Sequence, residues 1–98
     1  MDVMNGFLRA EISNPELYKS IIEFICSFHI RNGEFEGNTY IIKKMDQINF
    51  FIFPEFEYPD GHREIHAAIS IYRKQLLQAI QQEAHAKGFP IVSCELEE

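Results

Sequence analysis

The segment from Ile48 to Phe53 (INFFIF) is apolar on both faces of the strand that it predicts. Because a strand alternates its side chains between the two faces of a sheet, Ile48, Phe50 and Ile52 should point one way. Phe51 and Phe53 should then point the other way. Helices of the same chain can cover one face, and little sequence remains to cover the second. We therefore expect the second face to meet another molecule.

Three further segments have the alternation that is typical of strands. Phe7 to Ile12 predicts a first strand, and Asn38 to Lys44 predicts a second strand that forms a hairpin with Ile48–Phe53. Phe89 to Leu96 predicts a last strand.

Two segments have the signals of helices. Ser13-Asn14-Pro15-Glu16 offers a capping side chain, a proline for the first turn and an acid near the positive end of the dipole. This helix should run to about Ile30 or Arg31, before Asn32-Gly33. Its apolar arc is wider than a one-sided stripe, so we expect it to be wedged between two layers or buried partly against another chain. A second helix is predicted from about Arg63 to Lys87, ending at Gly88.

The resulting order is strand, helix, strand, strand, helix, strand. It predicts a single α+β domain over residues 1–98, a ferredoxin-like βαββαβ sandwich with two helices on one face of a four-stranded antiparallel sheet. One alternative stays open for residues 55–72. The alternation of Ile65, Ala67, Ile69 and Ile71 also permits a long hairpin around Pro59-Asp60-Gly61.

The uncovered sheet face and the loop beside it predict a docking surface for a protein partner. An apolar centre with a charged rim is the usual anatomy of such an interface. Acidic side chains after the third strand would steer a basic partner toward it. The residues expected to bind are Phe7, Arg9, Phe51, Phe53, Glu55, Glu57 and Asp60.

The composition and net charge indicate which classes of molecule the chain is expected to bind. The 98 residues carry a formal net charge of -6, which weighs against direct binding of nucleic acid, a polyanion that needs clustered Lys and Arg. Cys26 and Cys94 both lie in apolar surroundings and are expected to be free thiols. With no signal peptide and no membrane-length apolar run in the sequence, a cytoplasmic location is the expectation.

The sequence contains few residues placed to bind a metal or to act in catalysis. His62 and His66 are four residues apart, a spacing at which two imidazoles can share a metal, but no third ligand is defined. No nucleophile elbow or phosphate-binding glycine loop is present. We therefore expect a non-enzymatic binding protein without a cofactor, of the inhibitor, immunity or adaptor kind. The alternative is a homodimeric ferredoxin-like domain that binds a small ligand or metal near His62 and His66.

Overall fold

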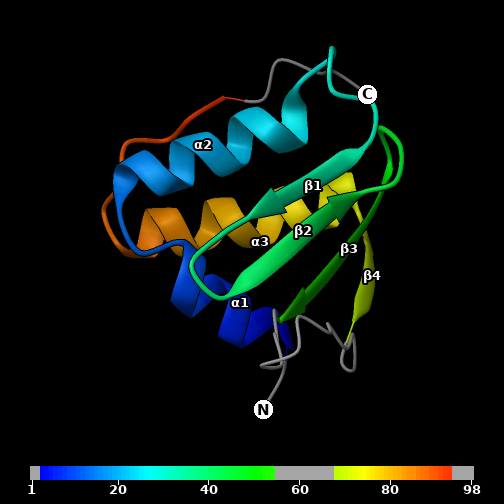
Figure 1. Cartoon of the computed structure of the whole chain (residues 1–98). Helices are drawn as coiled ribbons and strands as arrows, with labels where there is room; N and C mark the ends of the chain where they lie inside the picture. Colours follow the sequence, from blue (N-terminus) through cyan, green and yellow to red (C-terminus); the bar gives the residue numbers. More distant parts are fainter. Residues whose placement is uncertain (1–2, 55–67, 94–98) are drawn as a thin grey trace.

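The computed structural model describes residues 3–54 and 68–93, which form an α+β fold (Figure 1). Two helices come first, a four-stranded antiparallel sheet follows, and a third helix comes last. The strands lie in the sheet in chain order, β1-β2-β3-β4. The elements are α1 (Val3–Glu11), α2 (Pro15–Cys26), β1 (Gly33–Glu36), β2 (Tyr40–Lys44), β3 (Asn49–Pro54), β4 (Ile69–Tyr72) and α3 (Arg73–Ala86).

The α+β class with an antiparallel sheet of four strands is confirmed, whereas the predicted βαββαβ order is not what the structure shows. The first difference is α1, which replaces the strand expected over Phe7–Ile12. Val3, Met4, Phe7 and Leu8 also recur at helical spacing, and a short apolar run fits either period. Phe7 is fully buried in the core, so its predicted outward position is wrong. Arg9 is exposed, but on a helix and not on the sheet.

The second difference is β4, which lies within the segment that the sequence predicts to be helical. Ile69–Tyr72 instead pairs antiparallel with β3, with Asn49 opposite Tyr72 and Ile52 opposite Ile69. The alternative hairpin also requires this antiparallel pairing, and its expected turn at Pro59-Asp60-Gly61 lies outside the described residues. Pairing with β3 outweighs the weak helical period here, because β-branched Ile69 and Ile71 fit a pleated, half-buried surface well.

The start of α2 is confirmed in detail. Asn14 is the N-cap, and its Oδ1 accepts a hydrogen bond from the backbone N–H of Leu17 at 2.8 Å. The helix ends at Cys26, earlier than predicted. Its wide apolar arc is explained by its two neighbours, α3 on one side and the sheet on the other. Tyr18 bonds to Gln81 of α3, and the ring of Phe24 lies 5.6 Å from the ring of Phe35 in β1. This helix is therefore wedged between layers of its own chain.

The end of α3 follows the sequence signal. Gly88 adopts a left-handed φ of 75°, which favours glycine, and its N–H donates to the carbonyl of His85. Phe89 then returns its N–H to the carbonyl of Ala84 at 2.9 Å. The following residues, up to Ser93, run along the helices without joining the sheet, so the predicted last strand is absent over 89–93.

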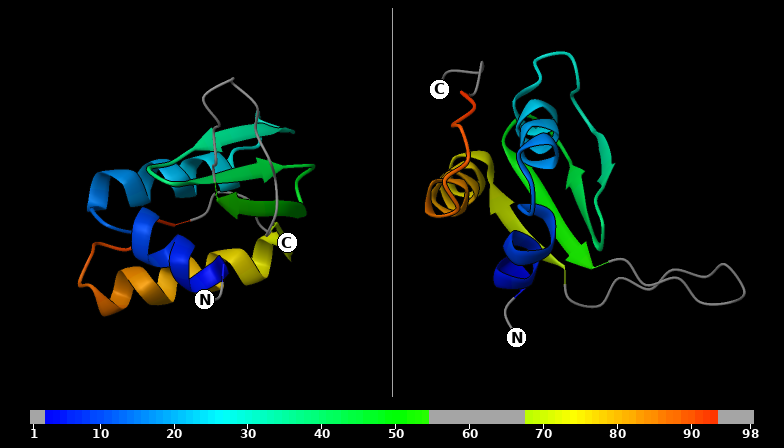
Figure 2. Two further views of the ribbon diagram at one scale, coloured as in Figure 1. Left: turned by 60° about the horizontal axis from the view of Figure 1, so that its bottom comes forward. Right: turned by 90° about the vertical axis from the view of Figure 1, so that its left-hand side faces the viewer.

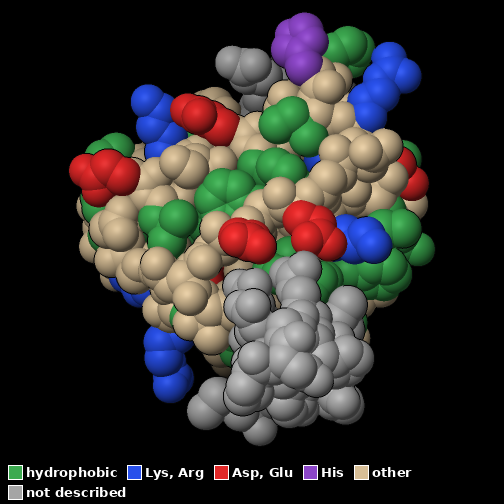
Figure 3. Space-filling model, in the orientation of Figure 1, with side chains coloured by type: hydrophobic (Ala, Val, Ile, Leu, Met, Phe, Trp, Pro, Cys, Tyr) green, Lys and Arg blue, Asp and Glu red, His purple; other side chains and the backbone are tan. Residues whose placement is uncertain are grey.

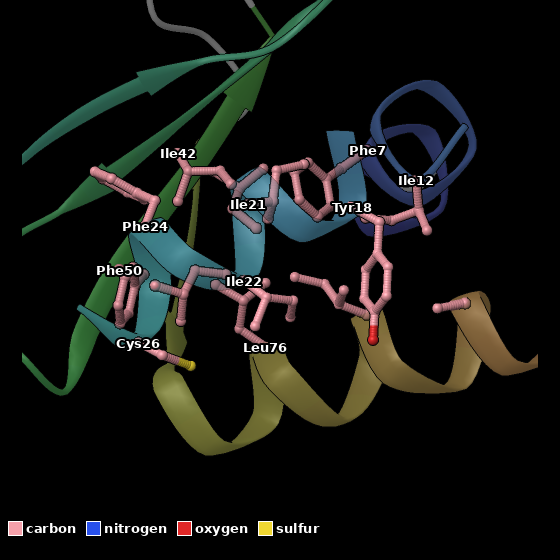
Figure 4. Close-up of a cluster of buried hydrophobic side chains, with 14 residues drawn as sticks. Phe7, Ile12, Tyr18, Ile21, Ile22, Phe24, Cys26, Ile42, Phe50 and Leu76 are labelled. Carbon is pink, nitrogen blue, oxygen red and sulfur yellow. The ribbon is translucent and has the colours of Figure 1, made fainter. Parts of the chain in front are cut away.

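The helices lie on one side of the sheet and enclose the core with it (Figure 2). Phe50 and Ile52 point toward the helices as predicted, and both are fully buried. Figure 4 shows how their neighbours meet from α1, α2, α3 and the sheet, with Phe7, Tyr18 and Leu76 converging from three different helices. The opposite face of the sheet carries none of these helices (Figure 2).

Candidate functional site

The face of the sheet that points away from the helices differs from its prediction. Phe51 and Phe53 do lie on it, since Phe50 and Ile52 occupy the helix face. Phe53, however, is only 3% exposed, and its cross-strand partner Ile41 is fully buried as well. Phe51 is half-buried, so the broad apolar surface expected on this face is not found. Figure 3 shows this face, with charged side chains among the hydrophobic ones.

Exposed apolar side chains gather instead at one end of the sheet. The α2–β1 loop and the β2–β3 turn lie side by side there, at the upper right of Figure 1, and the end of β4 adjoins the turn. Among the described residues, five of the six large exposed apolar side chains belong to this region. We call this surface the apolar end: Phe28, Ile30, Met45, Ile48 and Tyr72.

The β2–β3 turn inverts the usual pattern of a soluble protein, in which apolar side chains point inward. Lys44 is only 1% exposed, and the side chain of Gln47 turns back onto the backbone of the α2–β1 loop. Met45 and Ile48, which lie between and beyond them, point out, and Ile48 is 59% exposed. Lys44 and Gln47 thus point inward, while Met45 and Ile48 are exposed along with Asp46. Exposed apolar side chains that lie close together are expected of a contact surface.

Lys44 binds backbone carbonyls at the end of α2, and Gln47 binds those of the α2–β1 loop that follows. The Gln47 amide nitrogen donates to the carbonyls of Ser27, Phe28 and Ile30 at 3.2–3.4 Å. The Lys44 ammonium donates to the carbonyls of Phe24, Ile25 and Ser27 at 3.1–3.2 Å. The two polar side chains thus fix the loop that carries two members of the apolar end.

Lys44 is buried as a cation among apolar groups. Its ammonium lies 5.9 Å from the ring centroids of both Phe24 and Phe50, and among the described residues it contacts no carboxylate. Burial, and then the positive charge of Arg73, lower the pKa of Lys44 from its ordinary value. The carbonyls at the negative end of the α2 dipole are what stabilise the charge.

A hollow of about 420 Å³ opens in the middle of the apolar end. It is lined by the apolar side chains of Phe28 and Ile48, by Gln47, and by the charged residues Arg31 and Asp46. The side-chain amide of Asn49 and then the N–H groups of Ile48 and Asn49 lower the pKa of Asp46, so this carboxylate is ionised at neutral pH.

A second hollow of about 410 Å³ lies between α2 and the segment after α3, and Phe28 borders both hollows. Cys26 lines it and is disulfide-bonded, which corrects the expectation of a free thiol; spacing along the chain gave no signal for the bond. Cys94 lies outside the described residues.

The remaining sequence candidates lie in the part of the chain that the structure does not describe: Glu55, Glu57, Asp60, His62 and His66. Within residues 3–54 and 68–93, no group of His, Cys, Asp or Glu side chains is placed to hold a metal ion. No helix in those ranges has the length and apolar character needed to cross a bilayer.

Sequence reasoning missed four members of the apolar end: Phe28, Ile30, Met45 and Tyr72. It placed Ile48 on the helix face of a strand, whereas β3 begins at Asn49 and Ile48 belongs to the turn. The available signal was the presence of Met45 and Ile48 on either side of Asp46-Gln47, since large apolar residues are unusual in a tight, polar turn.

Comparison with known proteins adds no relative: no family model, curated protein or solved structure matches the chain. The geometry of the apolar end therefore carries the functional argument.

Proposed function

We propose that this chain is a small acidic binding protein that acts by contact with another protein, as an inhibitor, immunity-type protein or adaptor does. The docking surface is the apolar end rather than the sheet face around Phe51 and Phe53. One observation carries the proposal: Met45 and Ile48 of the β2–β3 turn are exposed, while the ammonium of Lys44, at the end of β2, is buried. Self-contained folding favours the opposite arrangement, because buried charge is costly and exposed apolar surface gains nothing.

The energetics of the apolar end agree with an interface. Full burial of an Ile or Phe side chain stabilises a complex by roughly 1.5–3 kcal/mol. Phe28 and Ile48 face the hollow together, so a single apolar side chain of a partner would remove both from water. Arg31 and Asp46, which also line the hollow, would supply the polar groups that surround such an anchor.

The charge of the chain indicates what kind of protein would bind. With 15 acidic and 9 basic residues, the formal net charge is -6, and its field attracts a basic protein. We therefore propose a basic protein that inserts an apolar side chain between Phe28 and Ile48. Long-range attraction would set the rate of encounter, and the apolar contact would set the lifetime of the complex.

The test compares two isoleucines of similar exposure. Ile48→Asp places a charge in the apolar end, whereas Ile91→Asp makes the same change at a residue that is 55% exposed and adjoins Val92, which is held by Tyr18 near the start of α2. The partner is captured with the native chain, purified, and its affinity for each variant is measured by calorimetry. We expect Ile48→Asp to weaken binding at least about tenfold, as loss of a central contact does, and Ile91→Asp to leave it nearly unchanged.

Equal affinities of the two variants would contradict the proposal. If the native chain instead captures a second copy of itself, and Ile48→Asp converts that dimer to a monomer, the apolar end is a dimer seam and the proposed foreign partner is wrong. Light scattering of the native chain at two concentrations separates these outcomes before any partner is purified.

A further inference from the structure

Carbonyl groups at the end of α2 and in the α2–β1 loop converge on two side chains from a distant part of the sequence. Lys44 donates to those of Phe24, Ile25 and Ser27, and Gln47 donates to those of Ser27, Phe28 and Ile30, at the distances given above. Lys44 is the last residue of β2, and Gln47 lies in the turn that follows it. Inside the loop, the N–H of Ile30 also donates to the hydroxyl of Ser27 at 3.2 Å.

This arrangement replaces the usual end of a helix. The last carbonyls of a helix have no partner within it, and a left-handed glycine commonly redirects the chain to satisfy them. Here the C-cap is Ser27, which has φ -67° and ψ 123°, and Gly33 comes only at the start of β1. Without a local cap, the path of the α2–β1 loop depends on the bonds that Lys44 and Gln47 donate.

We infer that Gln47 and Lys44 are positioning residues for partner binding, because they hold the α2–β1 loop in the shape that presents Phe28 and Ile30. The inference rests on the proposed function of the apolar end, and it explains why polar side chains point inward where apolar ones point outward. Neither residue needs to touch the partner. Their contribution is to order the loop before the partner arrives, so that binding does not have to order it.

Gln47→Glu is the sharpest variant, because it preserves the shape of the side chain but replaces the donating amide with a carboxylate that faces three carbonyls. Gln78→Glu makes the same change of charge at an exposed position of α3 and serves as the matched control. Gln47→Met, which removes the donor without adding charge, is the second variant in case the carboxylate prevents folding.

Amide hydrogen exchange of residues 27–31 is measured in the free protein and in the complex. We expect exchange of the Ile30 amide, which donates to the Ser27 hydroxyl, to rise about tenfold or more in Gln47→Glu and Gln47→Met, while the most protected core amides of β3 keep their native rates. In the complex, the loop of each variant should return to native protection, because the partner re-imposes its shape. The affinity should fall about tenfold, which is the cost of ordering a few side chains. Gln78→Glu should change none of these quantities.

The outcomes separate this inference from the proposed function. If Ile48→Asp weakens binding but the Gln47 variants bind as tightly as the native chain, the apolar end docks the partner and the positioning role is wrong. Native exchange rates in the loop of both Gln47 variants would also overturn the positioning role. If Ile48→Asp binds as tightly as the native chain, the proposed function itself is wrong.

Discussion

The carboxylate of Glu11 occupies the space that a β-carbon on Gly37 would need. Glu11 is buried at the end of α1, and it accepts hydrogen bonds from the backbone N–H groups of Asn38, Thr39 and Tyr40 at 2.7–2.8 Å. A helix that precedes the sheet therefore fastens the turn between β1 and β2. Gly37 is glycine because the carboxylate must approach the backbone closely there.

This relationship predicts the effect of Gly37→Ala. The added methyl group must displace the carboxylate of Glu11 from its three donors, at a cost of about 1–3 kcal/mol in the free energy of unfolding. Urea unfolding measures it. In a Glu11→Ala background, which empties the space, Gly37→Ala should cost much less, and the two substitutions should be strongly non-additive. Additive effects would show that the two residues do not interact.

The helix start at α2 gives a prediction that separates two neighbouring candidates. Ser13 and Asn14 are both suitable caps by sequence, and the structure assigns the bond to Asn14. Asn14→Ala should destabilise the protein by about 1 kcal/mol, because the N–H of Leu17 loses its acceptor. Ser13→Ala should change the unfolding free energy by less than about 0.5 kcal/mol, as is usual at exposed positions. Thermal or urea unfolding of both variants decides, and the reverse ranking would contradict the assigned cap.

Tyr18 fixes the segment after α3. Its hydroxyl donates to the side-chain carbonyl of Gln81 and accepts the N–H of Val92 at 2.9 Å, while the amide of Gln81 donates to the carbonyl of Val92 at 2.7 Å. Tyr18→Phe removes the hydroxyl from this closed network and should cost about 1–3 kcal/mol.

Hydrogen exchange at Val92 provides the local check, since its amide loses its acceptor in Tyr18→Phe and should exchange faster. Tyr72→Phe, at an exposed tyrosine, is the control and should leave both the exchange rate of Val92 and the stability unchanged. Slow exchange at Val92 in Tyr18→Phe would mean that the hydroxyl does not hold the segment.

Lys44 predicts a dependence of stability on pH. Its pKa is lowered in the folded protein by burial and by Arg73, while the unfolded chain keeps the ordinary value near 10.5. Between these two values the unfolded chain binds more protons, so the free energy of unfolding should rise with pH. The penalty of burying the charge is thus complete below the folded pKa and is relieved as the pH approaches 10.5.

Lys44→Met removes that contribution, so the stability of the native protein relative to Lys44→Met should increase from neutral pH toward pH 10.5. Urea unfolding across that range measures the difference. Lys19→Met, which removes an exposed lysine, should run parallel to the native protein. A native stability that falls relative to Lys44→Met as the pH rises would contradict the direction of the pKa change.

The parts of the fold that the sequence predicts are those decided by local chemistry. Asn14-Pro15 marks the start of α2, Gly88 the end of α3, and the pairing of β2 with β3 follows from two short runs joined by a tight turn. Two segments, Phe7–Ile12 and Ile69–Tyr72, are so short that their apolar residues fit both the helical and the strand period. Contacts with other parts of the chain therefore decide their structure. Pairing with β3 makes the second a strand.

The candidate site was harder to predict, because it depends on contacts between residues far apart in the sequence. Nothing near Lys44 indicates that its ammonium is buried; the reason is the end of α2, about twenty residues earlier, whose carbonyls need a donor. Once Lys44 and Gln47 point inward, Met45 and Ile48 are left to point outward. The apolar end is thus a consequence of tertiary structure and not of a motif.

The most direct test of the central claim is photo-crosslinking from the apolar end in the cells that make the protein. A photoreactive phenylalanine derivative replaces Ile48 in one variant and Ile91 in a second, two positions of similar exposure. We predict that the first variant forms an adduct with one basic protein, that Phe28→Asp in the same chain abolishes the adduct, and that the second variant does not form it. Adducts that are equal at the two positions, or that survive Phe28→Asp, would contradict the claim that the apolar end is where this protein binds its partner.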